Sequence, residues 1–233
     1  MLTEAFTEAF ALITSANADL YEILWLSIQV SLTALFVSIA LGLPIGTTLA
    51  IANFPGKNIC ITILNSLMGL PPVVVGLLVY LALSRSGPFG VFGLLYTPTA
   101  MVIAQVVLIT PIIAALTYQV MDDLHKEYQD LFFSLDIPLR KAVGAYLWDA
   151  RYSLITAVLA GFGRAISEVG AVIIVGGNID HLTRVMTTAI ALETSKGELS
   201  IALALGIILL TLALIVNGLV TTVRTRARYF GYA

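Results

Sequence analysis

The sequence predicts an all-α protein that crosses a membrane with five helices. Of its 233 residues, 59% are hydrophobic and 11% are charged, and the mean hydropathy is +0.98. The charges are bunched and leave uncharged runs at residues 23–56, 58–84, 86–121 and 199–223. About 20 apolar residues in a helix cross the roughly 30 Å hydrocarbon core of a bilayer, and each run is long enough. This composition excludes an ordinary soluble domain.

The five spanning helices are expected at residues 22–52, 60–83, 98–121, 152–178 and 199–223. They define a transmembrane domain at residues 22–223, and their odd number places the two termini on opposite sides. Lys and Arg side chains are enriched on the cytoplasmic side of membrane proteins. If the N-terminus lies outside, three cations of the loops lie outside: Arg85, Arg184 and Lys196. Eight then lie inside: Lys57, Lys126, Arg140, Lys141, Arg151, Arg224, Arg226 and Arg228. The sequence therefore predicts an outer N-terminus and an inner C-terminus.

The two ends of the chain are expected outside the bilayer. Residues 1–21 place Phe6, Phe10 and Ile13 at helical spacing, which favours an amphipathic helix on the outer surface, although a loosely ordered tail fits the same residues. Acidic side chains stand where a secretory signal would carry Lys or Arg, so the first apolar run is expected to stay in the mature protein. Residues 224–233 form a basic tail inside.

Two longer connections lie between the later spans. The inner one, at residues 122–151, mixes large apolar groups with polar ones where there is no membrane to enter. A short amphipathic helix there could offer Leu131, Phe132 and Leu135 to a groove on a partner, or these side chains could pack under the protein's own spans. The outer connection, at residues 179–198, holds an apolar stretch too short to cross, which is typical of a re-entrant or surface helix.

One pair of opposite charges falls inside a predicted span. Arg164 and Glu168 are four residues apart, so a continuous helix would place them on one face as an ion pair. Each charge costs roughly 2.5–3.5 kcal/mol to insert into a bilayer, and pairing reduces that cost. Such a pair either seals a helix or dimer contact or lines a path for an anion.

Small side chains recur at intervals of three and four on the same span: Ala160, Gly163, Ser167 and Gly170. They form a ridge that either lets another backbone approach closely or leaves room for a solute along a pore wall. At the end of the span, Gly176, Gly177 and Asn178 could supply backbone donors near the outer mouth.

Prolines interrupt the second predicted span. Pro71 and Pro72 remove two helix donors and split the span into halves that are each too short to cross alone. Broken helices are tolerated in a bilayer where the freed backbone is buried in protein or lines a cavity, so this break is either a pore element or a packing kink. Pro44 and Pro111 are weaker examples of the same feature.

The residue inventory argues against an enzyme. His125 and His181 lie far apart and Cys60 is the only cysteine, so no metal site, catalytic nucleophile or internal disulfide is expected. The Gly56-Lys57 dipeptide lacks the Walker spacing, so the chain is not expected to hydrolyse ATP alone. Nucleic-acid binding is disfavoured because no basic face occurs.

Several longer motifs carry a resemblance to a known family. They are LPPVVVGL at residues 70–77, LSRSGP at 83–88, TPTAM at 97–101, and AGFGRAISEVGA at 160–171, continuing to GGN at 176–178. With them the sequence resembles the membrane permeases of type I ATP-binding cassette (ABC) importers, and more narrowly the tungstate branch of the molybdate/tungstate permeases. The resemblance covers nearly the whole chain and implies five core helices with a cytoplasmic coupling helix between the third and fourth.

The coupling segment departs from the usual pattern of that family, which reads Glu-Ala-Ala, then Gly after three further residues, and later Ile-x-Leu-Pro. Asp130 takes the Glu position, Asp136 stands where Gly is expected, and Trp148-Asp149 replaces the closing Leu-Pro. The resemblance therefore transfers the segment, with these candidate contacts to an ATPase: Asp130, Leu131, Phe132, Ser134, Leu135 and Asp136.

The resemblance also implies partners and a mechanism. It implies a homodimer with a pore at its interface, two ATPase subunits that bind ATP and Mg²⁺ on the inner face, and an extracytoplasmic tungstate-binding protein. Arg85 and Arg184 are candidate docking residues for that binding protein, and this chain itself would hold no cofactor. Closure of the ATPase subunits on ATP would open the pore outward, and hydrolysis would reverse the change. The complex is expected in the cytoplasmic membrane. Candidate residues of the path or gate are Pro71, Pro72, Arg164, Ser167, Glu168 and Asn178.

Three rival functions stay open on the sequence. A molybdate or sulfate permease shares the same fold. An ion-coupled secondary transporter would need an inverted repeat and intramembrane acids besides Glu168, and the sequence shows neither. A structural or assembly subunit of the membrane would carry no solute itself.

Overall fold

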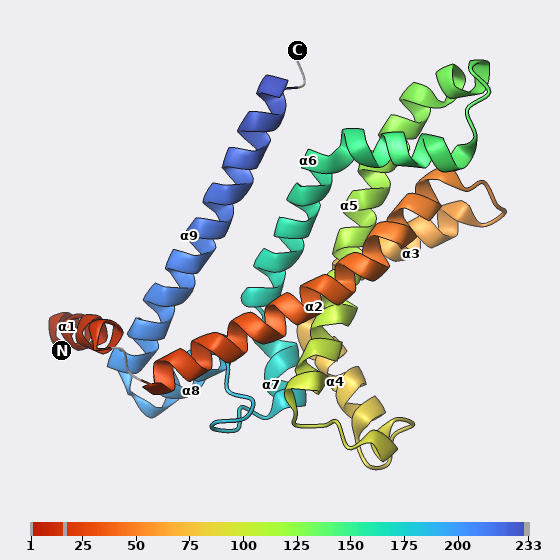
Figure 1. The fold of residues 1–233 in the computed structure, drawn as a ribbon. Helices are drawn as coiled ribbons and strands as arrows, with labels where there is room; N and C mark the ends of the chain where they lie inside the picture. The colour runs from red at the N-terminus through yellow and green to blue at the C-terminus, as the bar shows by residue number, and fades with distance from the viewer. Residues whose placement is uncertain (1, 16–17, 231–233) are drawn as a thin grey trace. The chain divides into compact units, whose positions relative to one another are not determined.

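The computed structural model describes residues 2–15 and 18–230, and every regular element within them is helical. In chain order the elements (Figure 1) are α1 (Leu2–Thr14), α2 (Ala18–Ile51), α3 (Lys57–Met68), α4 (Pro72–Leu83), η1 (Gly90–Phe92), α5 (Pro98–Ser134), α6 (Leu139–Ile166), α7 (Gly170–Gly176), α8 (Met186–Lys196) and α9 (Leu199–Phe230). Two parts of the predicted basic tail lie outside the described residues, namely residues 231–233 and the side chains of Arg224, Arg226 and Arg228.

Three helices are individually long and apolar enough to cross a membrane: α2, α5, and α9 over Leu199–Leu219. Two further spans result if each of the bent pairs α3–α4 and α6–α7 counts as one crossing. The total then equals the five spans expected from the sequence. The first bent pair breaks at the predicted prolines, whereas the break between α6 and α7 was not predicted.

The helices around the inner connection are longer than the spans predicted from hydropathy. α5 continues beyond residue 121 to Ser134, and α6 starts at Leu139 instead of residue 152. Residues 122–134 contain neither Gly nor Pro to end the helix, and Lys126 pairs with Asp122 one turn earlier at 2.6 Å. The expected separate segment at residues 122–151 is therefore a helical hairpin made by the ends of two long helices (Figure 1).

The chain forms two compact units, of which the first contains residues 1–34, 71–107 and 163–216. In this unit α4 packs directly on α7. A Cβ atom on Gly76 would lie 2.8 Å from the Cα atom of Ala171, closer than real side-chain contacts, so a glycine is needed at this approach. Fully buried side chains around these helices include Val75, Met101, Ala104, Val172, Val175 and Met186.

The second unit contains residues 35–70, 108–162 and 217–233. Here the second half of α2 lies close to α5, because a Cβ atom on Gly46 would approach the carbonyl oxygen of Ala114 to 2.4 Å. Leu64 of α3 packs beside Ala114 and its neighbour Ala115. Toward the hairpin, α5 and α6 share a core that includes Met121, Ala142, Tyr146, Ala150 and Leu154.

Candidate functional site

A break in the backbone separates α6 from α7 and carries the predicted charge pair. α6 ends at Ile166 and α7 begins at Gly170, so the expectation of one continuous helix through both charges is wrong. The ion pair forms nevertheless, with Arg164 Nη2 3.4 Å from Glu168 Oε2. The Ser167 hydroxyl donates to the carbonyl oxygens of Gly163 and Arg164, at 2.9 and 3.2 Å, and so satisfies carbonyl groups that the end of the helix leaves free.

Glu168 is held inside the first unit by several contacts. Its Oε1 accepts a hydrogen bond from the backbone N–H of Ala171 at 3.3 Å. Its own carbonyl oxygen accepts one from the hydroxyl of Thr187, which lies in α8, at 2.8 Å. Both bonds are buried, so the unwound backbone is satisfied by protein groups. This is the condition under which a helix can break inside a bilayer.

The two members of the charge pair differ in access to solvent. The Arg164 side chain is 39% exposed, whereas that of Glu168 is 5% exposed. Charge-assisted N–H···O hydrogen bonds are usually about 2.7–2.9 Å long, so the 3.4 Å contact is a loose one. Arg164 therefore has guanidinium donors that an oxyanion could reach, while Glu168 balances its charge from the protein side.

The predicted break at the prolines is confirmed. α3 ends at Met68, Pro71 is extended at φ −65° and ψ 123°, and Pro72 occupies the first position of α4. Proline suits that position because its missing N–H would have no helical partner there. By contrast, Pro44 and Pro111 lie inside α2 and α5, which continue through them as helices.

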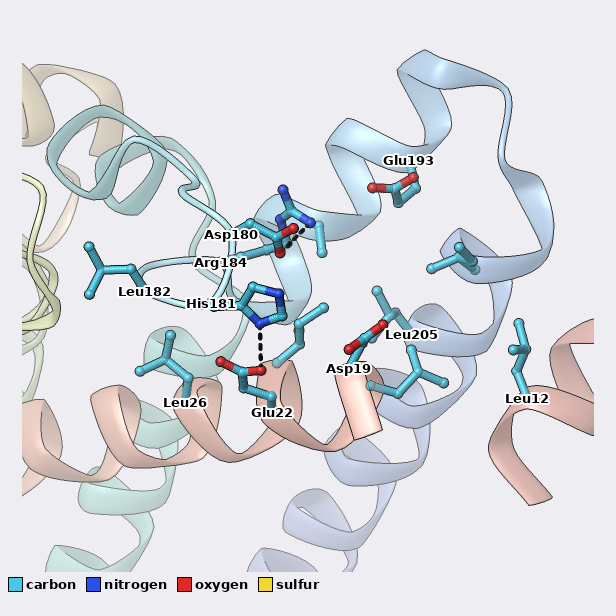
Figure 2. A pocket seen from close by; sticks show the side chains of 14 residues that line it. Leu12, Asp19, Glu22, Leu26, Asp180, His181, Leu182, Arg184, Glu193 and Leu205 are labelled. Carbon is cyan, nitrogen blue, oxygen red and sulfur yellow. Dashed lines mark hydrogen bonds and ion pairs between the residues drawn. The ribbon is translucent and has the colours of Figure 1, made fainter. Parts of the chain in front are cut away.

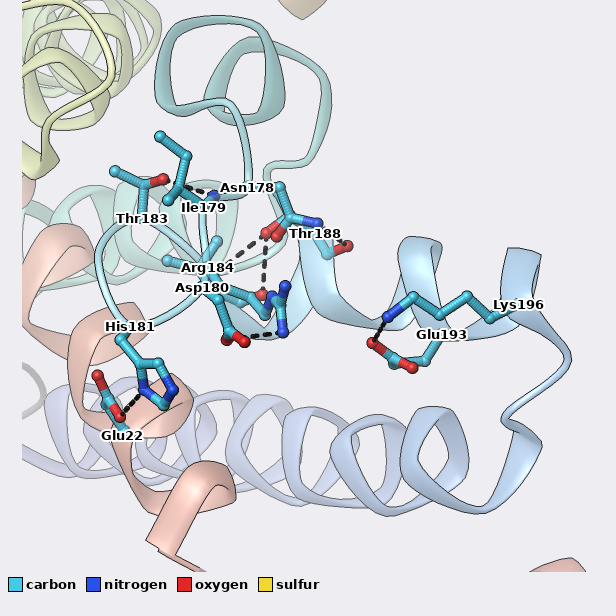
Figure 3. Close-up of polar contacts among 11 residues, drawn as sticks. Glu22, Asn178, Ile179, Asp180, His181, Thr183, Arg184, Thr188, Glu193 and Lys196 are labelled. Carbon is cyan, nitrogen blue, oxygen red and sulfur yellow. Dashed lines mark hydrogen bonds and ion pairs between the residues drawn. The ribbon is translucent and has the colours of Figure 1, made fainter.

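The end of α7 turns sharply into the outer connection (Figure 3). Gly177 and Asn178 both have positive φ angles, 73° and 51°. The amide Nδ2 of Asn178 donates to the carbonyl oxygen of Thr188 in α8 at 3.4 Å. The side-chain amide of Asn178, predicted as a path or gate residue, is thus directed at α8.

The small-residue ridge is not packed uniformly. A Cβ atom on Gly163 would meet nothing within 4 Å, whereas one on Gly170 would lie 3.0 Å from Cγ2 of Val73. Of these two glycines, Gly170 is the one that meets a neighbouring helix closely. Both the packing and the pore-wall interpretations of the ridge stay predictions.

The outer connection borders a pocket of about 150 Å³ (Figure 2). Its lining combines leucine side chains with four carboxyl groups, those of Asp19, Glu22, Asp180 and Glu193. His181 closes one side, with its Nδ1 2.8 Å from Glu22 Oε2 at the start of α2. The connection before α8 is therefore attached to a helix that lies 159 residues away in the chain.

The two arginines proposed to dock a partner differ in their surroundings. Arg184 is only 19% exposed and forms an ion pair with Asp180 at 2.7 Å (Figure 3), so its charge is already engaged. Arg85 is exposed, in the loop that follows α4. The docking role of both arginines stays a prediction.

The turn of the helical hairpin between α5 and α6 explains why Asp136 can stand where the family pattern has Gly. The backbone N–H groups of Asp136 and Ile137 donate to the carbonyl oxygens of Phe133 and Phe132, at 3.2 and 3.0 Å. This geometry requires a positive φ at Asp136, which is 50°. Glycine adopts such an angle readily and aspartate tolerates it better than most residues, so the aspartate at this position keeps the turn.

The predicted coupling residues differ in whether they face the core of the hairpin or solvent. Phe132 points inward, with its ring 5.4 Å from that of Tyr146 and 5.9 Å from that of Tyr128. Leu131 and Leu135 are exposed, and Asp130 and Ser134 are exposed beside them, with the Ser134 hydroxyl donating to the Asp130 carbonyl oxygen at 2.7 Å. The inward position of Phe132 corresponds to the alternative of packing on the protein's own helices.

Sequence reasoning missed two features of these regions. Phe133 is 90% exposed at the tip of the hairpin. The signal that could have found it is the helical spacing of Tyr128 and Phe132, which share the packed face and leave Phe133 off it. The pairing of His181 with Glu22 had no local signal, because it joins residues from opposite ends of the chain.

Most of the chain matches one family of membrane transport proteins. The family described as "Binding-protein-dependent transport system inner membrane component" matches residues 42–229. The chain belongs to this family. It is therefore an all-α, multi-pass permease of the cytoplasmic membrane with the type I ABC importer fold, a transport subunit and not an enzyme.

The relatives of this permease differ in their similarity to it. It is 40% identical to the tungstate uptake system permease protein TupB of Peptoclostridium acidaminophilum over 94% of this chain and 96% of the relative. It is 42% identical to a probable anion ABC transporter permease protein of Haloferax volcanii, covering 86% and 88% of the two chains. TupB of Campylobacter jejuni is 38% identical over 71% and 69%. Sulfate transport system permeases are more distant, as in Escherichia coli CysW at 25% over 70% and 59%.

The contact between His181 and Glu22 predicts a pH-dependent contribution to stability. The hydrogen bond that His181 donates to Glu22, followed by the negative charges of Glu22 and Asp180, raises the pKa of His181 above its ordinary value of about 6.5. A raised pKa in the folded state means that the contribution is fully present below the unfolded pKa and is lost as pH rises through the folded pKa.

We expect His181→Asn to lower the melting temperature of the permease more at pH 5.5 than at pH 8.5. Asn tolerates the positive φ of 54° at this position but does not titrate. Thermal unfolding of both proteins across this pH range measures the difference. Glu22→Gln should remove the same pH dependence, and a difference that stays constant with pH would contradict the assignment.

Proposed function

We propose that this permease is the membrane subunit of an ATP-driven importer of tungstate. The support is the likeness over nearly the whole chain to permeases named for tungstate uptake, together with a partly exposed arginine at a helix break. A molybdate or sulfate permease is the second candidate, but the sulfate permeases are more distant relatives. An ion-coupled secondary transporter is not favoured by membership of a binding-protein-dependent family.

The proposed complex contains two copies of this chain, two ATPase subunits and an outer binding protein. ATP and Mg²⁺ bind in the ATPase subunits on the inner side, and the binding protein delivers tungstate from outside, with Arg85 near its docking surface. The N-terminus lies outside and the C-terminus inside. Closure of the ATPase dimer on ATP moves the coupling hairpins and opens the pore outward, and hydrolysis returns it to the inward state.

Arg164 is the proposed contact for the anion within the membrane. Tungstate carries two negative charges, so entering a bilayer requires a compensating cation and hydrogen-bond donors. The guanidinium of Arg164 offers both, because its partly exposed donors can bind the anion while the ion pair with Glu168 stays in place. A weak site suits transport, since tight binding would slow release.

The exposed tip of the coupling hairpin is the proposed ATPase contact. Leu131, Phe133 and Leu135 present apolar side chains away from the hairpin core. An apolar helix end of this type fits a groove on a partner. Phe132 supports the surface from inside, by packing against Tyr146.

Substrate class is tested by uptake competition. In cells that carry the complete importer, we expect unlabelled tungstate to suppress uptake of labelled tungstate at least about tenfold more effectively than sulfate does, a difference of roughly 1.4 kcal/mol. Molybdate serves as the intermediate competitor. Equal or stronger suppression by sulfate would refute the tungstate assignment.

The role of Arg164 is tested in the assembled importer. We expect Arg164→Ala to reduce the maximal uptake rate by at least about tenfold, because removing one charged hydrogen-bond partner of an anion typically costs roughly 1.5–3 kcal/mol. Lys196→Ala is the matched control, since Lys196 is another partly exposed cation paired with a nearby acid, at 2.9 Å from Glu193. Normal uptake by Arg164→Ala, or failure of the complex to assemble, would favour a structural role for the pair.

The coupling surface is tested by co-purification with the ATPase subunits. We expect Phe133→Asp to lose most of the bound ATPase, because it places a charge at the centre of an apolar contact. Val91→Asp is the control, since Val91 is equally exposed but lies in η1. A complex that keeps its ATPase and its transport with Phe133→Asp contradicts the assignment of this surface.

A further inference from the structure

A small cavity lies beside the break between α6 and α7, inside the first unit. Its polar lining comes from Ser27 and Ser31 of α2, Gln105 of α5, Glu168 of the break, and Thr187 of α8. Its volume is about 10 Å³. One water molecule needs roughly 10–15 Å³ by the same measure, so the space suits a single small ligand and excludes a tetrahedral oxyanion.

Gln105 presents an unpartnered acceptor at this cavity. The residue is 4% exposed, and its Nε2 donates to the carbonyl oxygen of Ala165 at 3.1 Å. Its Oε1 is buried and has no hydrogen-bond partner among the described residues. A buried amide oxygen without a partner is unfavourable in a protein interior, and more so at the depth of a membrane, where bulk water is absent.

Two of the three hydroxyl groups in the lining already donate to other acceptors, and the third, that of Ser31, makes no hydrogen bond to Gln105 Oε1. The Ser27 hydroxyl donates to the carbonyl oxygen of Ile23 at 2.6 Å, and Ser27 Oγ also accepts from the N–H of Met186 at 2.8 Å. The Thr187 hydroxyl donates to the Glu168 carbonyl oxygen at 2.8 Å. The lining therefore offers mainly lone pairs, and its ligand must donate hydrogen bonds.

We propose that this cavity binds one ordered water molecule, which donates a hydrogen bond to Gln105 Oε1 and links α5 to the unwound segment that carries Glu168. Water matches the volume, donates to an acceptor-rich lining, and can accept in return from the Ser31 hydroxyl. A metal cation is disfavoured because Glu168 is already balanced by Arg164, so an added positive charge would be buried without compensation. The site goes beyond the proposed function and does not depend on the identity of the transported anion.

The test is an experimental structure of the assembled importer in lipid nanodiscs, at a resolution that shows ordered water. We expect a single density peak about 2.7–3.2 Å from Gln105 Oε1. The peak should be lost in Ser31→Val, which fills the space with methyl groups. It should persist in Ser38→Val, a matched change of a buried serine two turns along the same helix that does not line the cavity.

Two variants of Gln105 test the proposal without the change in packing that Ser31→Val introduces. Gln105→Glu retains a side-chain oxygen acceptor and should keep the peak, whereas Gln105→Met removes the acceptor and should lose it. Absence of the peak in the wild-type map, where other buried waters are resolved, would overturn the proposal. A melting temperature raised specifically by Na⁺ or K⁺ relative to choline, and no longer raised in Gln105→Met, would overturn it in favour of a cation.

Discussion

Backbone groups inside a bilayer must find partners within the protein, and this requirement governs how the first unit is built. The helix through residues 152–178 does not continue, so the carbonyl and N–H groups around Ser167–Val169 lose their helical partners. The hydroxyl of Thr187, the carboxylate of Glu168 and the hydroxyl of Ser167 replace those partners. The break is thus sustained by side chains that come from α8 as well as from the broken helix.

This arrangement gives the short outer helix α8 a structural task. Its first residues meet the break through Thr187, and the N–H of Met186 donates to Ser27 of α2. The connection before α8 is joined to α2 again by His181 and Glu22. A segment too short to span the membrane therefore connects the start of the chain with the region where the permease holds its paired charges. A helix end held this way keeps Arg164 partly exposed and Glu168 buried.

The second unit meets a different constraint at its hairpin. α5 and α6 extend beyond the apolar stretches and need a core of their own outside the hydrocarbon. Tyr146 forms its centre: its ring stacks on that of Tyr128 and is tilted against that of Phe132, and its hydroxyl lies 3.2 Å from Nδ1 of His125. Because these aromatic groups hold the two helices together, the side chains at the tip can remain exposed.

The amino-acid sequence by itself determined the features that depend on local composition and spacing. Hydropathy predicted five crossings, which the structure matches if each bent helix pair is one span. Pro71 and Pro72 predicted the first helix break, and the long motifs predicted the family. Each of these signals lies within one continuous stretch of the chain. Arg164 and Glu168 were identified as a pair for the same reason. Only the tertiary structure decided that their helix ends between them, that Phe132 turns inward and Phe133 outward, and that His181 meets Glu22. Those outcomes depend on contacts between residues far apart in the chain, such as Thr187 with Glu168 and Tyr146 with Phe132, and the energy of such contacts leaves no local pattern in the sequence.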